Sequence, residues 1–295
     1  MLSSIIDYHN ATKHRLTGYA AGPGQLEWAS QPVPFRLFHG TQQFQLPLQA
    51  DRLATEVAVL HGEVTVTPWP LSATSLALLL ELSLGLAAWK QWPGQDDSHR
   101  WALRCQPSSG NLHPMEAYLL LPHAQPATTA ADAPMLAAGV YHYFSRDHLL
   151  SRRCFWQQGP APTAIPTTLC FMGLSALSWR TAWKYGERAW RYVHLDAGHA
   201  MAAVRYAATL LGWSVTLLDS VDDESIERLL GINQNAAASQ QDREIPVALL
   251  QIDSSGAPTP HQPEWLEQLL PGDWLGQGSR ITRQSTVDWP LLEEA

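Results

Sequence analysis

Charge is scarce in this 295-residue sequence. Asp, Glu, Lys and Arg make up only 16% of it, against about 25% in an average soluble domain. The 27 acidic and 19 basic residues leave a net charge of −8, which argues against nucleic-acid binding through a global positive field. The three cysteines, Cys105, Cys154 and Cys170, are odd in number and lack C-x-x-C spacing. We therefore expect reduced, mostly buried thiols, as is typical of a cytoplasmic protein.

Several motifs of nucleotide binding and catalysis are also missing. The sequence contains no G-x-G-x-x-G, no G-x-x-x-x-G-K-[ST] and no G-x-S-x-G. Two histidine pairs, 9 with 14 and 194 with 199, are five residues apart, a spacing that does not put both rings on one helix face. These absences disfavour a dinucleotide-binding sheet, a hydrolase and a zinc enzyme, and we expect no metal.

One apolar stretch raises the question of a membrane span. Residues 71–89 (LSATSLALLLELSLGLAAW) are about long enough to cross a bilayer. Glu81 lies at the middle, where a carboxylate costs roughly 2.5 kcal/mol or more, and four Ser and Thr residues dilute the stretch. Ser72 and Ser75 are good N-caps for a soluble helix. We therefore predict a buried core helix over 71–90 and no membrane association, and the first 15 residues lack the pattern of a secretory signal.

Elsewhere the pattern mixes strands and helices without strict alternation. Runs rich in β-branched and aromatic residues predict strands near 63–67, 115–121, 139–144, 167–172, 213–218 and 245–252. Apolar residues at helical spacing predict helices near 3–15, 192–211 and 222–230. Residues 1–70 carry six scattered prolines between 23 and 70 and read as an arm over the core. The fold class expected is α+β, with a central sheet flanked by helices and an N-terminal wrapping arm.

The densest polar segment is RCQPSSGNLHP, residues 104–114, directly before a predicted strand. Two hydroxyls, a carboxamide and a glycine lie between two prolines, and His113 precedes a proline, which favours extended geometry. Such a loop suits a planar ligand with a polar edge, with Arg104 neutralising an anionic group. Pro, Ser, Gly and Asn are also what ordinary turns use, so a plain turn remains the alternative.

A second segment, WRTAWKYGERAWRY at 179–192, interleaves cations with aromatic rings. Cations at 180, 184, 188 and 191 would share one face if the helix were continuous, and Gly186 makes that continuity doubtful. Lys184 and Tyr185 are candidate proton donors for an anion and aromatic-ring site. The alternatives are a solvated helix face, in which Glu187 pairs with Lys184 or Arg191, and single-stranded nucleic-acid binding. The net charge disfavours the last of these.

Three long motifs, taken together, resemble one family. RCQPSSGNLHPMEAYLLL, GVYHYFSRDHLL and WKYGERAWRYVHLDAGHAMAAVRYAATLLGW occur in an order and spacing that are similar to the SagB/ThcOx-type branch of the nitroreductase-like flavoproteins. The opening YHNATKHRL and LEWASQPVPFRLF also resemble the N-terminal arm of that branch. The resemblance covers nearly the whole chain and implies a nitroreductase-like α+β fold with a mostly antiparallel sheet, which binds FMN at a dimer interface.

The resemblance also implies roles for particular residues. Arg104, Ser108, Ser109, Gly110 and Asn111 would hold the ribityl chain, phosphate and pyrimidine edge of FMN. Lys184 and Tyr185 match the Lys-Tyr pair of members that oxidise azolines, and would assist proton removal while hydride passes to the flavin. Arg188, and Lys13 or Arg15 in the arm, are candidates for the phosphate.

The expected organisation is an arm at 1–70, a flavin domain at 71–279 and a linker or tail at 280–295. The tail resembles the linker that joins a second, similar domain in some relatives, so a tandem pseudo-dimer is an alternative to a homodimer.

The function implied is an FMN-dependent oxidoreductase acting on a small molecule or peptide, with NADH or NADPH as one option for the electron donor. The rival is a non-catalytic half that serves as a pairing scaffold or binds flavin only with a partner. The cyclodehydratase that azoline oxidases require is not evident here, so the substrate does not follow from the fold.

Overall fold

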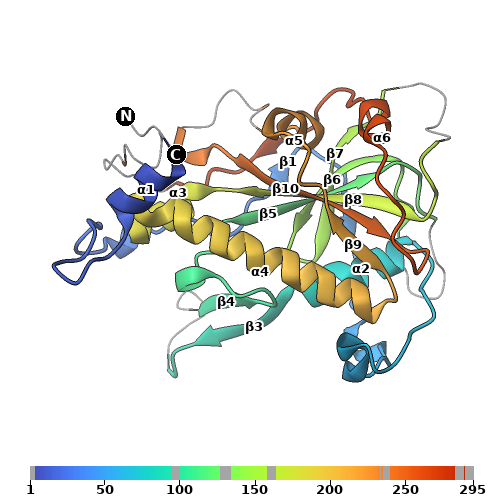
Figure 1. The fold of residues 1–295 in the computed structure, drawn as a ribbon, viewed down its shortest axis with the longest axis horizontal. Coiled ribbons are helices and arrows are strands. Elements are labelled where there is room, and N and C mark those ends of the chain that lie inside the picture. Colours follow the sequence, from blue (N-terminus) through green and yellow to red (C-terminus); the bar gives the residue numbers. More distant parts are fainter. Residues whose placement is uncertain are drawn as a thin grey trace.

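A seven-stranded antiparallel sheet forms the centre of the molecule (Figure 1). The computed structural model describes residues 4–94, 100–126, 134–157, 164–232, 234, 240–282 and 289. The strand order is β2-β7-β6-β5-β8-β10-β9, and every neighbouring pair is antiparallel. The strands are β2 (Gln43–Gln45), β5 (Met115–Leu121), β6 (Gly139–Phe144), β7 (Leu149–Phe155), β8 (Leu169–Ala176), β9 (Ser214–Leu217) and β10 (Ile245–Asp253). The predicted α+β class with an antiparallel sheet is confirmed.

Helices cover both faces of this sheet, so its central strands are apolar on both sides. On one face, Met115, Ala117 and Leu119 of β5 pack with α2 (Ala73–Ser83) and α4 (Ala189–Leu210). On the other face, Tyr118 and Leu120 pack with α5 (Asp223–Leu230) and α6 (Pro263–Gln268). In Figure 1 the long α4 crosses one side of the sheet, while α5 and α6 lie on the opposite side.

The apolar stretch forms a shorter helix than predicted. Helix α2 is buried and begins with a capping box between Ser72 and Ser75, as expected, but it ends at Ser83. The chain then turns at Gly85, where a Cβ would lie 2.6 Å from the carbonyl oxygen of Glu81. Residues beyond the turn form a strand rather than more helix, so the prediction of helix through residue 90 is wrong. The Glu81 carboxylate accepts hydrogen bonds from two backbone amides of the arm, Gln49 (2.6 Å) and Ala50 (3.0 Å).

The strand after α2 belongs to a hairpin that projects from the body (Figure 1). Strands β3 (Leu86–Gln91) and β4 (Arg100–Arg104) pair with each other, outside the main sheet. Most of β3 is exposed, including Trp89. The hairpin leads directly into the polar loop at 105–114, so it borders the candidate site.

The predicted helix near 192–211 is confirmed as α4, and a separate helix precedes it. Helix α3 (Ser178–Tyr185) ends at Gly186, whose φ of 55° and ψ of −133° break the helix. A short 3-10 turn, η6 (Gly186–Arg188), then leads into α4. Cations at 180, 184, 188 and 191 therefore do not share one continuous helical face.

The N-terminal segment wraps over the core as expected. It contains α1 (Ile5–Thr12), which lies beside α3 and α4 in Figure 1, and β1 (Phe38–His39), which pairs with β11 (Gln277–Gly278). Residues 63–67 form no strand, contrary to prediction, and the carbonyl of Val66 lies beside Gly212 at the end of α4. The remaining short 3-10 turns are η1 (Trp28–Ser30), η2 (Ala50–Arg52), η3 (Val57–His61), η5 (Ser109–Asn111) and η7 (Gln240–Asp242).

The three cysteines are free thiols: Cys154 and Cys170 are buried, and Cys105 is exposed. The expected boundaries at residues 70 and 279 stay predictions, and of the tail only residues 280–282 and 289 lie within the described part. Ile281 is buried with Leu177 and Trp179, and Trp289 packs against the same cluster.

Candidate functional site

The polar loop after β4 adopts an unusual backbone. Gly110 (φ 66°), Asn111 (φ 59°) and His113 (φ 51°) all lie in the left-handed region, which costs a non-glycine residue about 1–2 kcal/mol. The extended geometry expected for His113 is therefore wrong. Its amide donates to Ser108 Oγ (2.9 Å), and its carbonyl accepts from Arg180 Nη1 (2.9 Å), which together fix the turned conformation.

This loop meets the Lys-Tyr pair at Gly110. A Cβ on Gly110 would lie 2.9 Å from Tyr185 Oη and 3.0 Å from Lys184 Nζ. The two segments are more than 70 positions apart in the sequence, and the break at Gly186 leaves both polar side chains at the end of α3. The fold thus brings one predicted loop and one predicted pair of polar side chains to the same point.

Tyr185 is held against α4 by a second tyrosine. The rings of Tyr185 and Tyr192 lie 4.1 Å apart at 31°. Burial raises the pKa of Tyr185, and Tyr192 and Asp196 raise it further. The phenol is therefore protonated at neutral pH and available as a hydrogen-bond donor.

Both serines of the loop are bound to one buried carboxylate, that of Asp196 on α4. Ser108 Oγ donates to Asp196 Oδ2 (2.6 Å), and the amide and hydroxyl of Ser109 donate to Oδ1 (2.8 and 2.7 Å). Asp196 is only 1% exposed. Asp196 is the one acidic residue of α4, but it belongs to no pattern that sequence analysis tests, so its contribution was missed.

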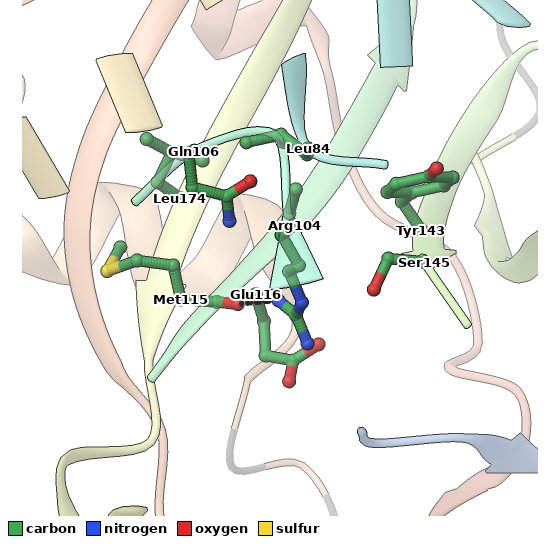
Figure 2. A pocket seen from close by; sticks show the side chains of 9 residues that line it. Leu84, Arg104, Gln106, Met115, Glu116, Tyr143, Ser145 and Leu174 are labelled. Carbon is green, nitrogen blue, oxygen red and sulfur yellow. Dashed lines mark hydrogen bonds between the residues drawn. The ribbon is translucent and has the colours of Figure 1, made fainter. Parts of the chain in front are cut away.

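Arg104 lies behind the loop and is buried. Its guanidinium donates to the carbonyls of Met115 (3.2 Å) and Pro34 (2.6 Å), and so links the arm to β5. Burial lowers the pKa of Arg104 to about 10. Figure 2 shows this guanidinium beside Glu116 at a cavity of about 10 Å³, close to the size of one water molecule.

A buried ion pair supports the loop from the sheet side. Arg180 Nη1 contacts Glu116 Oε1 at 2.5 Å, and the Glu116 carboxylate also contacts His142 Nε2 at 2.7 Å. Burial opposes ionisation of Glu116, but Arg180 and His142 outweigh it and lower its pKa to about 2. Burial, with Arg104 and Arg180 nearby, lowers the pKa of His113 to about 3, so His113 is neutral and its Nε2 donates to Asn111 Oδ1 (2.8 Å).

The candidates for an anion site gather at the end of α1. Arg188 donates to the carbonyl of Thr12 and to Tyr192 Oη (3.2 Å). Lys13 follows Thr12 as the C-cap of α1, so the fold brings Arg188 and Lys13 into one region, with Arg15 two residues further along the chain.

A larger cavity, of about 670 Å³, opens between the arm, the hairpin and the loop. This volume is in the range of small-molecule and cofactor sites. Four aromatic rings line it, and Asn111 and His113 form its border with the loop. The rings are Trp28, Phe35, Trp89 and Trp101. Sequence patterns missed this cavity because the arm and the hairpin contribute side chains from segments far apart in the chain.

Two kinds of feature are absent from the described residues. They contain no group of three or more His, Cys, Asp or Glu side chains arranged to hold a metal ion. Nor does any helix in this part of the chain combine the length and apolarity that a bilayer span requires.

Comparison with known proteins agrees with this geometry. Residues 83–240, more than half of the chain, match the nitroreductase family. The chain belongs to the nitroreductase family. Members of this family are typically FMN-dependent oxidoreductases.

The individual relatives of this chain are distant in sequence. A protein of Methanocaldococcus jannaschii described as a nitroreductase is 26% identical over 135 residues, which cover 43% of this chain and 64% of the relative. A crystal structure of a protein from Anabaena variabilis, also described as a nitroreductase, superposes with a TM-score of 0.60 at 23% identity. That match covers 97% of this chain and 52% of the Anabaena chain, so this chain spans about half the length of that neighbour.

A nitroreductase from Exiguobacterium sibiricum solved in complex with FMN is a weaker match. It is 13% identical, and the match covers 72% of this chain and 95% of that one, with a TM-score of 0.36. This superposition is too loose to bear on individual residues.

Proposed function

We propose that this chain is an FMN-dependent oxidoreductase of the SagB/ThcOx-type branch, which transfers hydride between a substrate or NAD(P)H and FMN. The observation that carries the proposal is the contact of Gly110 with Lys184 and Tyr185. Because two motifs of the resemblance meet there, the residues proposed for cofactor binding and for proton transfer lie within reach of one ligand.

The residues present fit a flavin. Gly110 lets Lys184 and Tyr185 approach the loop more closely than any side chain would allow, and the cavity that Asn111 lines offers aromatic surface for a planar ring. The hydroxyls of Ser108 and Ser109 are bound to Asp196, so we expect Gly110 and Asn111 to face the cofactor while the serines hold the loop. Arg104, bonded to Pro34 and Met115, would act on the cofactor through the arm and the loop.

The phosphate is proposed to bind at the end of α1. Arg188, Lys13 and Arg15 supply three cations in this region, and guanidinium groups recognise phosphate well. The contact of Arg188 with Thr12 fixes its direction, so phosphate binding would depend on docking of α1.

FMN supplies two-electron chemistry, and the protein supplies binding, orientation and proton transfer. Tyr185 keeps its proton because burial raises its pKa, so we assign it as a donor to the substrate or the cofactor. Lys184 Nζ is the second polar group at Gly110, and we assign it to assist the removal of the proton that a substrate gives up when it is dehydrogenated.

We further propose that the chain works as a pair, with a second copy or with a second domain of the same fold. Trp28 and Trp92 are each 66% exposed and Trp89 is 41% exposed, and Trp28 and Trp89 line the cavity. Exposed rings of this size gathered around a ligand cavity favour a partner surface that covers them.

The deciding experiment is the absorbance spectrum of the purified protein, with FMN counted per chain and bleaching by NADH and NADPH recorded separately. We expect a flavin spectrum and about one FMN per chain. A colourless protein that takes up no added FMN would overturn the proposal. Bound flavin that no reductant bleaches, or FMN only in the presence of a partner, would favour the non-catalytic half instead.

A further inference from the structure

We propose that Asp196 is the positioning residue that fixes the loop at 108–113 for the reaction. Its carboxylate accepts three hydrogen bonds from Ser108 and Ser109, all between 2.6 and 2.8 Å. No other residue in the described part of the chain donates to it in a hydrogen bond or an ion pair. The link to catalysis rests on the proposed flavin function, whereas the link to loop conformation does not.

The loop needs such an anchor because its backbone is strained. Asn111 and His113 have positive φ although neither is glycine, and such residues persist only where the surroundings hold them. Ser108 Oγ donates to Asp196 and at the same time accepts from the His113 amide (2.9 Å). One carboxylate therefore restrains the loop at Ser108 and Ser109 directly and at His113 through Ser108.

The position of Asp196 on α4 adds a second consequence. Tyr192 is four residues earlier, so both side chains lie on one face of the helix. Tyr192 stacks on Tyr185 at 4.1 Å, while Asp196 holds the serines of the loop. A single helix face thus sets the position of Tyr185 relative to Gly110, and its two contacts align the two halves of the site.

Charge is the property that an amide cannot replace. The carboxylate accepts from three donors and is 1% exposed, and bonds to an ionised acceptor are about twice as strong as neutral ones. In Asp196→Asn, the side-chain NH₂ would face either Ser108 Oγ or the Ser109 amide and hydroxyl, so at least one serine loses its acceptor.

The chain offers a matched control in Asp253 of β10. Asp253 is also 1% exposed and accepts from backbone amides and a hydroxyl, namely Ser255 N (2.9 Å), Thr259 N (3.0 Å) and Thr259 Oγ1. Asp253→Asn removes the same kind of anchor from a loop that has no part in the proposed site.

The test compares wild type, Asp196→Asn and Asp253→Asn in the full chain. Amide hydrogen exchange of residues 105–114 is measured without added flavin, and FMN affinity is measured by fluorescence titration. For Asp196→Asn we expect exchange in this segment to accelerate at least tenfold and the Kd for FMN to rise at least tenfold. For Asp253→Asn we expect both to stay within twofold of wild type. Ser108→Ala combined with Asp196→Asn should lose little beyond Asp196→Asn alone, because both changes break one chain of hydrogen bonds.

The two measurements, hydrogen exchange and FMN affinity, distinguish the possible failures. Unchanged exchange at 105–114 in Asp196→Asn overturns the positioning role, whatever the cofactor. Faster exchange with unchanged FMN affinity also overturns it, because the loop would then be anchored without consequence for the ligand. If wild type binds no FMN, the proposed function fails. The hydrogen-exchange measurement then still decides whether Asp196 anchors the loop. Equal effects in both Asp→Asn variants would show general destabilisation and contradict the proposal.

Discussion

At the scale of single residues, two buried arginines hold the arm in place, and a glycine sets how closely the loop meets α3. Arg104 and Arg180 are buried and bind the carbonyls of Pro34 and Val33, so they fasten the arm to the site. Gly110 lets the loop approach the two polar side chains of α3, which fill the space that a side chain would need.

The close packing at Gly110 predicts a sharp effect of a single methyl group. In Gly110→Ala the new Cβ would lie within 3.0 Å of both Tyr185 Oη and Lys184 Nζ, so both side chains must move. We expect a loss of about 1–2 kcal/mol in the free energy of unfolding from the positive φ, together with weakened FMN binding. The control is Gly24→Ala, which has the same kind of backbone (φ 69°) and no atom within 4 Å. Equal FMN affinity in the two variants would argue against a cofactor site at Gly110.

Lys184 separates two kinds of flavin chemistry. We expect Lys184→Ala to keep FMN and to lose substrate dehydrogenation by about 10²-fold or more, since a side chain positioned for proton transfer contributes roughly that much. The measurement is bound FMN per chain and single-turnover flavin reduction by substrate. Unchanged turnover would indicate simple nitro- or flavin-reductase chemistry and not an azoline-type site.

The resemblance singled out Gly110, Lys184 and Tyr185 from long motifs, and the structure brings these three residues together. Asp196 and Glu116 could not be identified in the same way. An aspartate in a helix usually lies on a solvated face, and only the fold shows that this one is buried beneath a loop 88 residues earlier in the chain.

At the scale of elements, the most consequential feature is the break between α3 and α4. The sequence left continuity open at Gly186, and the structure resolves it: α3 ends there. Periodicity could not find the end of α2, because residues 84–89 are as apolar as the helix before them. The strand forms because β3 pairs with β4, and this tertiary contact outweighs the local helical pattern of apolar residues.

Replacing either of two glycines, one at this break and one within α4, by alanine should change the free energy of unfolding in opposite directions. Gly186 has φ 55° and ψ −133°, and a Cβ would lie 2.9 Å from the Trp289 ring, so Gly186→Ala should destabilise by about 1–3 kcal/mol. Gly198 lies within α4 with no atom near its Cβ position, and Gly198→Ala should stabilise by about 0.5–1 kcal/mol. Chemical denaturation measures both. A neutral Gly186→Ala would mean that the break is not required.

At the scale of the whole molecule, buried charges join the arm, the sheet and the last strands. Glu244, next to β10, accepts from Tyr118 (2.8 Å) and Ser175 (2.5 Å) and pairs with Arg36 of the arm (3.0 Å). Asp242 accepts from the amide of Ile281 (2.9 Å). The composition suggested only a large core. A charged fraction of 16% did not indicate that several of the charged side chains are buried in pairs.

The buried carboxylate of Glu116 predicts a loss of stability in acid. The pKa of Glu116 is lowered to about 2 in the folded protein and is near 4.3 when unfolded, so the unfolded chain binds more protons between these values. The stabilisation is therefore complete above about pH 4.3 and is lost as the pH falls towards 2, by roughly 1–3 kcal/mol. We expect the free energy of unfolding of wild type to fall more steeply over this range than that of Glu116→Gln.

Removing one partner of a buried pair is itself destabilising, so Glu116→Gln combined with Arg180→Met serves as a second reference. If the free energy of unfolding has the same pH dependence in wild type and both variants, Glu116 does not ionise in the folded protein as described.

The wrapping arm also constrains the order in which the chain can assemble. Its contacts reach far forward along the sequence: Tyr8 Oη donates to the carbonyl of Glu187 (2.6 Å), Arg36 to that of Asp242 (2.9 Å), and the amide of Leu37 to Ser279 Oγ (3.0 Å). During synthesis the arm therefore emerges before these partners, and contacts of such long range form slowly. The bonds of Arg36 and Leu37 can form only after residues 242 and 279, respectively, have been translated.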